Sequence, residues 1–224
     1  MKRIFFVVTA MIISVAASAQ INEVGVFAGG ANYIGDVGPT TYIAPKDVAL
    51  GFMYRWNRSP RHSYRASFTY GKITSEDADS DASGRQQRGY KFDNSIKELS
   101  LGLEFNFFDF NLHESDLKVT PYVYSGISYF WYTELYVQNG VTYRGDSKGA
   151  LAIPMTVGIK TNVIPGFVLG FEAGARYTFS DNIDGSNPEN AVLAFGNLES
   201  NDWYVFTGFT LTYTFGNKPC YCAE

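Results

Sequence analysis

Two histidines, His62 and His113, are the imidazole groups with which this chain could perform acid–base chemistry. A hydrolase with a serine or threonine nucleophile needs its base within hydrogen-bond range of that hydroxyl. The two histidines are well separated in sequence, and each lies in a predicted turn without such a partner. We therefore interpret them as surface residues, and we predict no catalytic residue and no enzyme.

Three aspartates, Asp77, Asp79 and Asp81, alternate as in the first half of a calcium-binding loop. Such a loop has glycine at its sixth position and glutamate at its twelfth. Ala82 and Arg88 occupy those positions here, so we favour a solvated loop face, with weak cation binding as the alternative. No other spacing of His, Cys, Asp or Glu matches a metal site, and we predict no metal and no cofactor.

Gly25, Gly29 and Gly30 could belong to a phosphate-binding loop, but that loop requires a helix directly after it. The residues around them alternate as in a strand. Glycines within a strand permit close packing or bending, which is the role we predict for them.

Cys220 and Cys222 are the only cysteines, and they stand one residue apart near the C-terminus. A disulfide between residues i and i+2 is difficult to close, because side chains on an extended segment do not reach the required geometry. A strained ring, two unpaired thiols and a bridge to another protein stay open as alternatives. Cys220 and Cys222 are therefore candidate partner-binding residues, through an intermolecular disulfide.

The composition excludes several classes of protein. Aromatic residues reach 17% and charged residues only 18% of the chain, against a usual charged share of about 25%. Disordered chains are poor in aromatics and rich in charge, so disorder is excluded for most of the sequence. A mean hydropathy of -0.11 excludes a bundle of membrane helices. The abundance of Tyr, Phe and Thr favours β-structure.

The first 19 residues have the pattern of an export signal. A basic start at Lys2 and Arg3 precedes an apolar stretch over residues 4–15, and Ala17-Ser18-Ala19 is a small-residue cleavage pattern. Because Lys2 and Arg3 leave with the signal, the formal net charge falls from -4 to -6, which argues against a nucleic-acid partner. The mature protein is expected beyond the inner membrane, where cysteines can oxidise.

Eight segments alternate between apolar residues and small or polar ones with a period of two, which predicts strands. In the second, Val48, Leu50 and Phe52 face one way while Ala49 and Met53 face the other. The fifth has the least clear pattern, since both of its faces are apolar. The predicted strands are residues 23–33, 48–57, 64–71, 98–107, 119–132, 151–162, 167–178 and 203–215.

The connections between these strands alternate in length. Outer-membrane barrels show this rhythm, with long loops outside the cell and short turns in the periplasm. We therefore predict an all-β fold, an eight-stranded antiparallel transmembrane β-barrel of the bacterial outer membrane, with a periplasmic sandwich as the alternative. The predicted long connections are residues 74–93, 133–150 and 180–202, and the predicted short ones are residues 58–62, 109–118 and 163–166.

The strand face opposite the apolar one carries small residues and a few charges, unlike the surface of a soluble sandwich. An eight-stranded barrel has an interior just wide enough for side chains to fill it. We predict a paired charge network there, since an unpaired buried charge is costly. The predicted interior charges are Arg55, Arg65, Glu98, Glu104, Lys160, Glu172 and Arg176. The predicted aromatic girdles, at the two membrane interfaces, contain Tyr54, Trp56, Tyr64, Tyr129, Trp131, Tyr177, Trp203 and Tyr213.

The last predicted strand ends in FTGFTLTYTF, residues 206–215, which resembles the terminal signal read by the barrel-assembly machinery. An even number of strands leaves both termini in the periplasm. The predicted organisation is a signal peptide over residues 1–19, a barrel over residues 20–215 and a periplasmic tail over residues 216–224.

Three segments resemble the PorG family of outer-membrane barrels: NEVGVFAGGANYIGDV at residues 22–37, PYVYSGI at residues 121–127 and IPMTVGIK at residues 153–160. The resemblance implies a non-enzymatic component of the type IX (Por) protein secretion system. It also implies two partners in a periplasmic ring, a PorK/GldK-type lipoprotein and a PorN/GldN-type subunit, and a link to gliding motility in cells that glide. Outer-membrane lipid is the further expected partner. A small OmpA- or OmpW-like channel or structural barrel is the alternative function.

Overall fold

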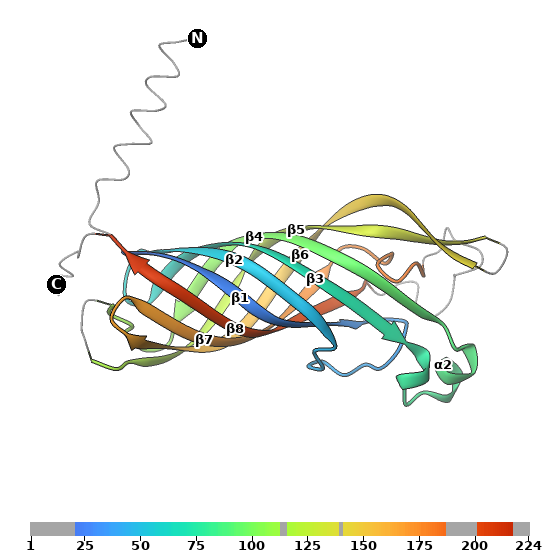
Figure 1. The fold of residues 1–224 in the computed structure, drawn as a ribbon, viewed down its shortest axis with the longest axis horizontal. Coiled ribbons are helices and arrows are strands. Elements are labelled where there is room, and N and C mark those ends of the chain that lie inside the picture. Colours follow the sequence, from blue (N-terminus) through green and yellow to red (C-terminus); the bar gives the residue numbers. More distant parts are fainter. Residues whose placement is uncertain (1–20, 113–115, 139–140, 187–200, 217–224) are drawn as a thin grey trace, which may run out of the picture.

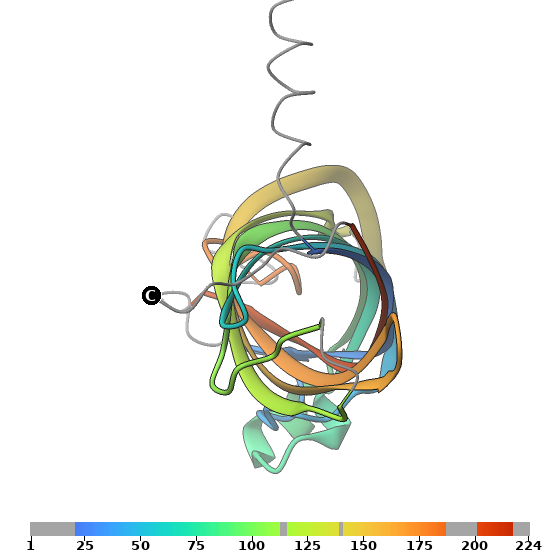
Figure 2. The same ribbon diagram turned by 90° about the vertical axis from the view of Figure 1, so that its left-hand side faces the viewer.

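The computed structural model describes residues 21–112, 116–138, 141–186 and 201–216. Within them, eight antiparallel strands pair in sequence order, and β8 pairs with β1 to close a barrel. Figure 1 shows the barrel from the side, and Figure 2 shows its closed ring from one end. The predicted eight-stranded antiparallel barrel is confirmed. Its strands are β1 (Ile21–Ile34), β2 (Asp47–Asn57), β3 (His62–Glu76), β4 (Lys91–Asn106), β5 (Val119–Gln138), β6 (Val141–Ile164), β7 (Phe167–Thr178) and β8 (Trp203–Phe215).

The alternation in sequence becomes an alternation between the outside and the inside of the barrel. On β2, Val48, Leu50 and Phe52 are 67%, 55% and 69% exposed, whereas Ala49 and Met53 are buried. Every strand carries large exposed apolar side chains of this kind. A continuous apolar exterior is what a barrel presents to the hydrocarbon of a membrane.

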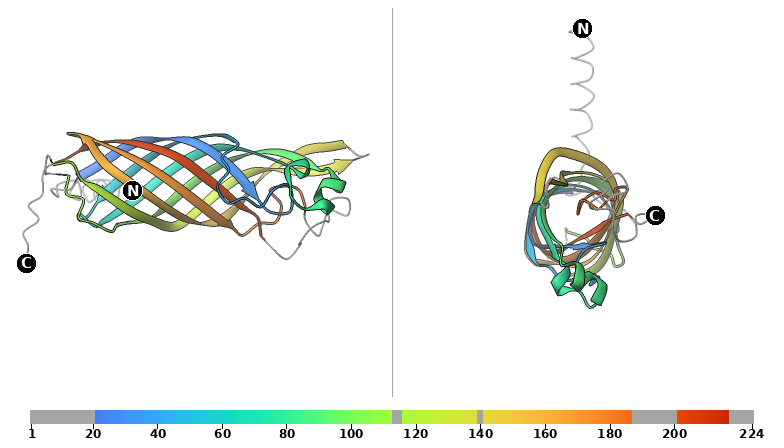
Figure 3. Two further views of the ribbon diagram at one scale, coloured as in Figure 1. Left: turned by 90° about the horizontal axis from the view of Figure 1, so that it is seen from below. Right: turned by 90° about the vertical axis from the view of Figure 1, so that its right-hand side faces the viewer.

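The two ends of the barrel differ. At the terminal end, Ile21 and Gly216 lie beside the described parts of the connections, residues 58–61, 107–112, 116–118 and 165–166. The opposite end, called the loop end below, carries residues 35–46, 77–90, 179–186 and 201–202. Figure 3 shows the small helix α2 (Ser83–Arg88) at this loop end.

The predicted long connection over residues 133–150 is wrong. β5 continues to Gln138 and β6 begins at Val141, so the two strands form a hairpin that projects beyond the loop end (Figure 1). The rings of Tyr136 and Tyr143 stack across it, with centroids 5.8 Å apart. A register shift between Thr133 and Leu135 interrupts the period of two, which explains why the sequence pattern ended too early.

The predicted polar loop over residues 74–93 is shorter than expected. β3 continues to Glu76 and β4 begins at Lys91, and the 3-10 helix η1 (Asp77–Asp79) and α2 lie between them. Gly89 ends α2 with a φ of 64°, a left-handed conformation that glycine adopts without strain. Among the described residues, no helix is long and apolar enough to cross a membrane.

The barrel interior has two halves of different chemistry. The half towards the loop end is an apolar core that includes Phe27, Ile96, Phe130, Tyr204 and Phe206. The half towards the terminal end is filled by charged and polar side chains, which form the first candidate site.

Candidate functional site

The terminal half of the interior holds a network of buried ion pairs centred on Glu104. Its carboxylate accepts hydrogen bonds from Arg55 Nε at 2.9 Å and from Lys160 Nζ at 2.5 Å. Arg65 Nη1 lies 3.6 Å from the same carboxylate, and none of the four side chains is more than 3% exposed. Because these residues come from β2, β3, β4 and β6, the network joins walls that are distant in sequence.

Glu23 belongs to this network, although the sequence pattern predicts for it only a position at the start of a strand. Arg55 Nη1 donates to Glu23 Oε2 at 3.1 Å, and the pairing of β1 with β2 sets the two residues directly opposite each other. Asn57 and Thr212 donate to the same carboxylate at 2.8 and 2.6 Å. The seven predicted charges comprised four bases and three acids, and Glu23 supplies the fourth acid. The excess of one base was the signal in the sequence that a further buried acid exists, since an unpaired buried charge is strongly unfavourable.

Glu172 forms a second centre on β7. Both terminal nitrogens of Arg65 donate to its two carboxylate oxygens, each at 2.7 Å, and Tyr122 donates to Oε2 at 2.5 Å. Bidentate arginine–carboxylate pairs are among the strongest protein hydrogen bonds. Tyr122 is 1% exposed, so the fifth strand looked apolar on both faces because its inward face carries buried tyrosines such as this one.

Glu98 and Arg176 join the charged half to the apolar half. Arg176 Nε lies 3.2 Å from Glu98 Oε2, and Tyr204 donates to the same oxygen at 2.5 Å. The Arg176 guanidinium also lies over the Phe206 ring, 4.7 Å from its centroid. The structure thus places all seven sequence-predicted charges inside the barrel, each in an ion pair.

This arrangement closes the lumen. The eight charged side chains that cross the terminal half are each at most 4% exposed, and Phe110 lies beneath Lys160 with its ring centroid 5.1 Å from the ammonium nitrogen. An open channel would instead leave its lining side chains hydrated. The network is therefore suited to holding the walls together and blocking passage.

A second buried polar cluster, which the sequence pattern did not predict, lies at the loop end. The Tyr33 hydroxyl is 2.8 Å from Asp184 Oδ2 and also hydrogen-bonds with Asp202. Both carboxyl groups are buried, at 1% and 2% exposure. A phenol has one proton to donate, so the second contact requires a proton on one of the two carboxyl groups. The cluster therefore holds a proton shared among three oxygen-bearing side chains.

The electrostatics of this cluster favour that proton. Burial raises the pKa of Asp184 to about 7. Burial, followed by the nearby Asp184 charge, also raises the pKa of Asp202. Backbone donors at Ser186 and Ile183 reach these carboxylates at 2.8 and 2.9 Å without reversing the shifts. The protonated cluster fastens residues 183–186 to the inner wall of β1.

We expect the attachment of residues 183–186 to weaken as the pH rises. The folded-state pKa of Asp184 lies above its value in the unfolded chain, so its stabilising contribution is complete below about pH 4 and is lost as pH rises through about 7. Stability should fall by at most about 1.4 kcal/mol per pH unit for each proton released. Hydrogen exchange at the Ile183 and Ser186 amides, corrected for intrinsic rates, measures this. Asp184→Asn should flatten the dependence of this exchange on pH, whereas Asp81→Asn, a control at an exposed position, should not. Identical pH profiles for the wild type and both variants would contradict the shared proton.

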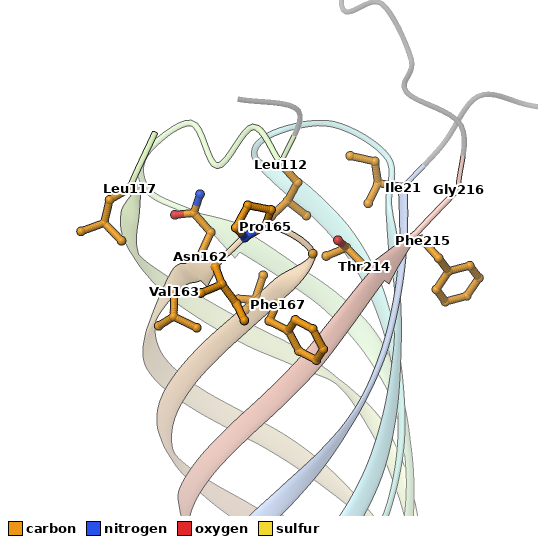
Figure 4. Close-up of a pocket in the computed structure, with 13 residues that line it drawn as sticks. Ile21, Leu112, Leu117, Asn162, Val163, Pro165, Phe167, Thr214, Phe215 and Gly216 are labelled. Carbon is orange, nitrogen blue, oxygen red and sulfur yellow. The ribbon is translucent and has the colours of Figure 1, made fainter. Parts of the chain in front are cut away.

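A hollow opens at the terminal end beside the last described residue, Gly216. Leu112 and Pro165 line it together, next to the β6–β7 turn and the end of β8 (Figure 4). Leu117, on its rim, is 73% exposed, and Phe215 is 45% exposed and points away from the barrel. Its lining mixes these apolar groups with Asn162 and other polar residues, as the rim of a protein-binding surface does.

Comparison with models of protein families shows to which family the chain belongs. A family model described as "Domain of unknown function (DUF6089)" matches residues 2–224. The chain belongs to the DUF6089 family. No match was found among curated protein sequences.

Solved structures similar to the DUF6089 chain include outer-membrane barrels. Ail, the attachment invasion locus protein of Yersinia pestis, in complex with the heparin analogue sucrose octasulfate, is 11% identical, with a TM-score of 0.49 over 88% of this chain and 100% of that one. Neisserial surface protein A is 11% identical, with a TM-score of 0.48 over 88% and 98% of the two chains. A major outer membrane protein from Thermus thermophilus is 14% identical, with a TM-score of 0.49 over 88% and 100%. The barrel architecture itself rests on the strand pairing described above.

Among the remaining sequence candidates of the DUF6089 chain, His62 lies apart from the two buried clusters. His62 is exposed at the start of β3 and contacts the Ser59 hydroxyl through Nδ1 at 3.2 Å. His113, Cys220 and Cys222 lie outside the described residues. Gly29 has the packing role predicted for it, because a Cβ there would overlap the carbonyl oxygen of Thr207 on β8.

Asp77 corrects the prediction of a solvated aspartate loop. It is fully buried, and Arg88 donates to its two carboxylate oxygens at 2.6 and 2.7 Å. Burial opposes its ionisation, but hydrogen bonds from Arg88 and from the Gly38 and Tyr90 amides outweigh burial and lower its pKa. Arg88 stands at the sequence position where a calcium loop needs glutamate. Its guanidinium therefore binds the Asp77 carboxylate in the way that a metal cation would in such a loop. Asp79 pairs with Lys46 at 2.5 Å.

Proposed function

We propose that this protein is a non-enzymatic outer-membrane component of the type IX protein secretion system. The observation that carries the proposal is the filled lumen, because a barrel that passes nothing through its centre must act through its rims. The apolar exterior and the predicted export signal support an outer-membrane location. The resemblance of residues 22–37, 121–127 and 153–160 to the PorG family supports the choice of machine.

In this proposal the terminal end faces the periplasm and the loop end faces outward. The hollow beside Gly216 then opens towards the periplasm and offers Leu117 and Pro165 to a protein partner. The proposed partners are a PorK/GldK-type lipoprotein and a PorN/GldN-type subunit, whose ring the barrel would anchor or organise. In cells that glide with the same machine, motility depends on this anchoring.

Cys220 and Cys222 supply a covalent form of this attachment in the proposal. The chain offers no third cysteine with which either could pair, and the periplasm permits disulfides. A bridge from this tail would hold a ring subunit at the membrane even if the contact surface is small.

Deleting the protein is expected to abolish export of type IX cargo, and gliding where the cell glides, because the ring loses its membrane anchor. Cargo in the culture medium is the measurement, with plasmid-borne wild type as the control. Normal secretion in the deletion strain would refute the proposal.

Leu117→Asp should reduce crosslinking of the ring subunits to this barrel. Ile43→Asp, which changes a similarly exposed apolar residue at the loop end, should leave that crosslinking unchanged. Non-reducing gels of the same cells, with thiols blocked before lysis, test the proposed disulfide.

A further inference from the structure

Two lysines stand together at the edge of the apolar exterior nearest the loop end, and neither forms an ion pair among the described residues. Lys72 on β3 and Lys97 on β4 are both exposed, and neither has an ion pair or side-chain hydrogen bond with the described residues. The register pairs Tyr70 with Lys97 and Lys72 with Ser95, so the lysines are diagonal neighbours. Diagonal positions of this kind lie about 7–8 Å apart, close enough for like charges to repel.

Three of the other cations at the loop end have acidic partners. Lys46 pairs with Asp79, Arg144 pairs with Asp93, and Lys148 lies 3.6 Å from Glu134. Lys72 and Lys97 therefore form a local excess of positive charge, which we call the lysine pair. Such an excess is favourable when an external anion lies between the two ammonium groups.

The lysine pair sits at the boundary where a lipid headgroup would lie. Directly towards the barrel middle, the outward side chains are Tyr70 and Leu99, which are 46% and 45% exposed, and Trp131 is opposite Lys97 on β5. Aromatic side chains mark the membrane interface in barrels of this kind. β3, β4 and β5 lie side by side on the barrel (Figure 1), so the apolar chains of one lipid could cover all three.

A hollow beside Lys97 adds hydrogen-bonding groups to this charge. Its lining includes Ser95 from β4, Trp131 and Thr133 from β5, and Ser147 from β6. Hydroxyl groups next to an aromatic ring suit the hydroxyls and the apolar face of a sugar, whereas the ammonium groups suit a phosphate. A simple phospholipid headgroup would use only the charge.

We propose that the lysine pair and the hollow beside it bind a phosphorylated glycolipid of the outer leaflet. Lys72 and Lys97 hold its phosphate, Ser95, Thr133 and Ser147 hold its sugar, and the outer faces of β3 to β5 contact its acyl chains. The inference goes beyond the secretion role, uses only the orientation proposed above, and can fail without affecting the secretion proposal.

The test is a lipid titration of the purified mature protein in detergent micelles, followed by native mass spectrometry. The probe is bisphosphorylated lipid A. Each lysine near an anionic lipid contributes about a fivefold gain in binding, so Lys72→Gln with Lys97→Gln should weaken binding by about 25-fold. Lys72→Arg with Lys97→Arg should retain it. The matched control, Arg58→Gln with Lys118→Gln, removes the same charge at the terminal end and should change nothing.

Two further ligands separate the glycolipid from charge alone. Lipid A without its phosphates should bind to the wild-type protein as weakly as bisphosphorylated lipid A binds to the Lys72→Gln, Lys97→Gln protein. Phosphatidylglycerol should bind to the wild-type protein more weakly than bisphosphorylated lipid A does. Equal binding of phosphatidylglycerol and lipid A would overturn the glycolipid assignment. The site itself would be overturned if the Lys72→Gln, Lys97→Gln protein and the Arg58→Gln, Lys118→Gln protein lost lipid A binding equally while both kept their heat-modifiable gel mobility.

Discussion

Replacing Glu104 with alanine is expected to destabilise the folded barrel by about 3–5 kcal/mol, because the substitution leaves buried cations without their partner. Glu104 accepts from Arg55 and Lys160 and lies 3.6 Å from Arg65, all within the closed interior. The three positive charges would then share two remaining carboxylates, Glu23 and Glu172. Urea unfolding in lipid vesicles measures the loss.

Two comparisons separate this effect from a general loss of charge. Asp109→Ala removes the partner of Arg61 from an exposed pair, 51% and 66% exposed, at the terminal end. Such pairs contribute about 0–1 kcal/mol, so this variant should remain close to wild type. Glu104→Met combined with Lys160→Met restores the charge balance and should recover part of the stability. Equal stability of Glu104→Ala and Asp109→Ala would show that the network does not hold the barrel together.

The strands and their two faces could be predicted because they depend on local pattern. In a barrel, a side chain points either to lipid or to the interior, so the period of two identifies both the strand and its inner residues. Arg55, Arg65 and Glu98 were assigned to the interior for this reason alone. The alternation also held at strand positions with charged side chains, because an arginine that points into the barrel occupies the same kind of strand position as an alanine that does so.

The partners inside the barrel could not be predicted, because register decides them. Glu23 meets Arg55 only because β1 pairs with β2 in the observed register, and the sequence does not state that register. Tyr33 and Asp202 are 169 positions apart and meet only when β8 closes against β1. The burial of Asp77 depends in the same way on donors from Gly38, Arg88 and Tyr90.

The barrel is expected to conduct no ions when it is reconstituted in a planar bilayer. Two different layers would have to open for a current to pass. The charged layer is paired and at most 4% exposed, and the apolar layer places Phe130 and Phe206, at 0% and 2% exposure, across the other half of the lumen. Stepwise currents from the wild-type protein would favour the alternative function, a small OmpA- or OmpW-like channel, and would remove the observation that carries the secretion proposal.

Variants of each layer test whether both are needed for closure. Glu104→Ser with Lys160→Ser removes the central ion pair of the charged layer without changing the net charge, and Phe130→Ala with Phe206→Ala removes two rings from the apolar layer. Because each layer fills the lumen independently, either double variant alone should stay silent, and only the fourfold variant should conduct. Heat-modifiable mobility shows that each variant has folded, and a known porin in the same bilayer shows that the assay detects openings. Currents from the Glu104→Ser, Lys160→Ser protein alone would mean that the charged layer is the sole seal, so that the apolar half of the interior contributes to stability and not to closure.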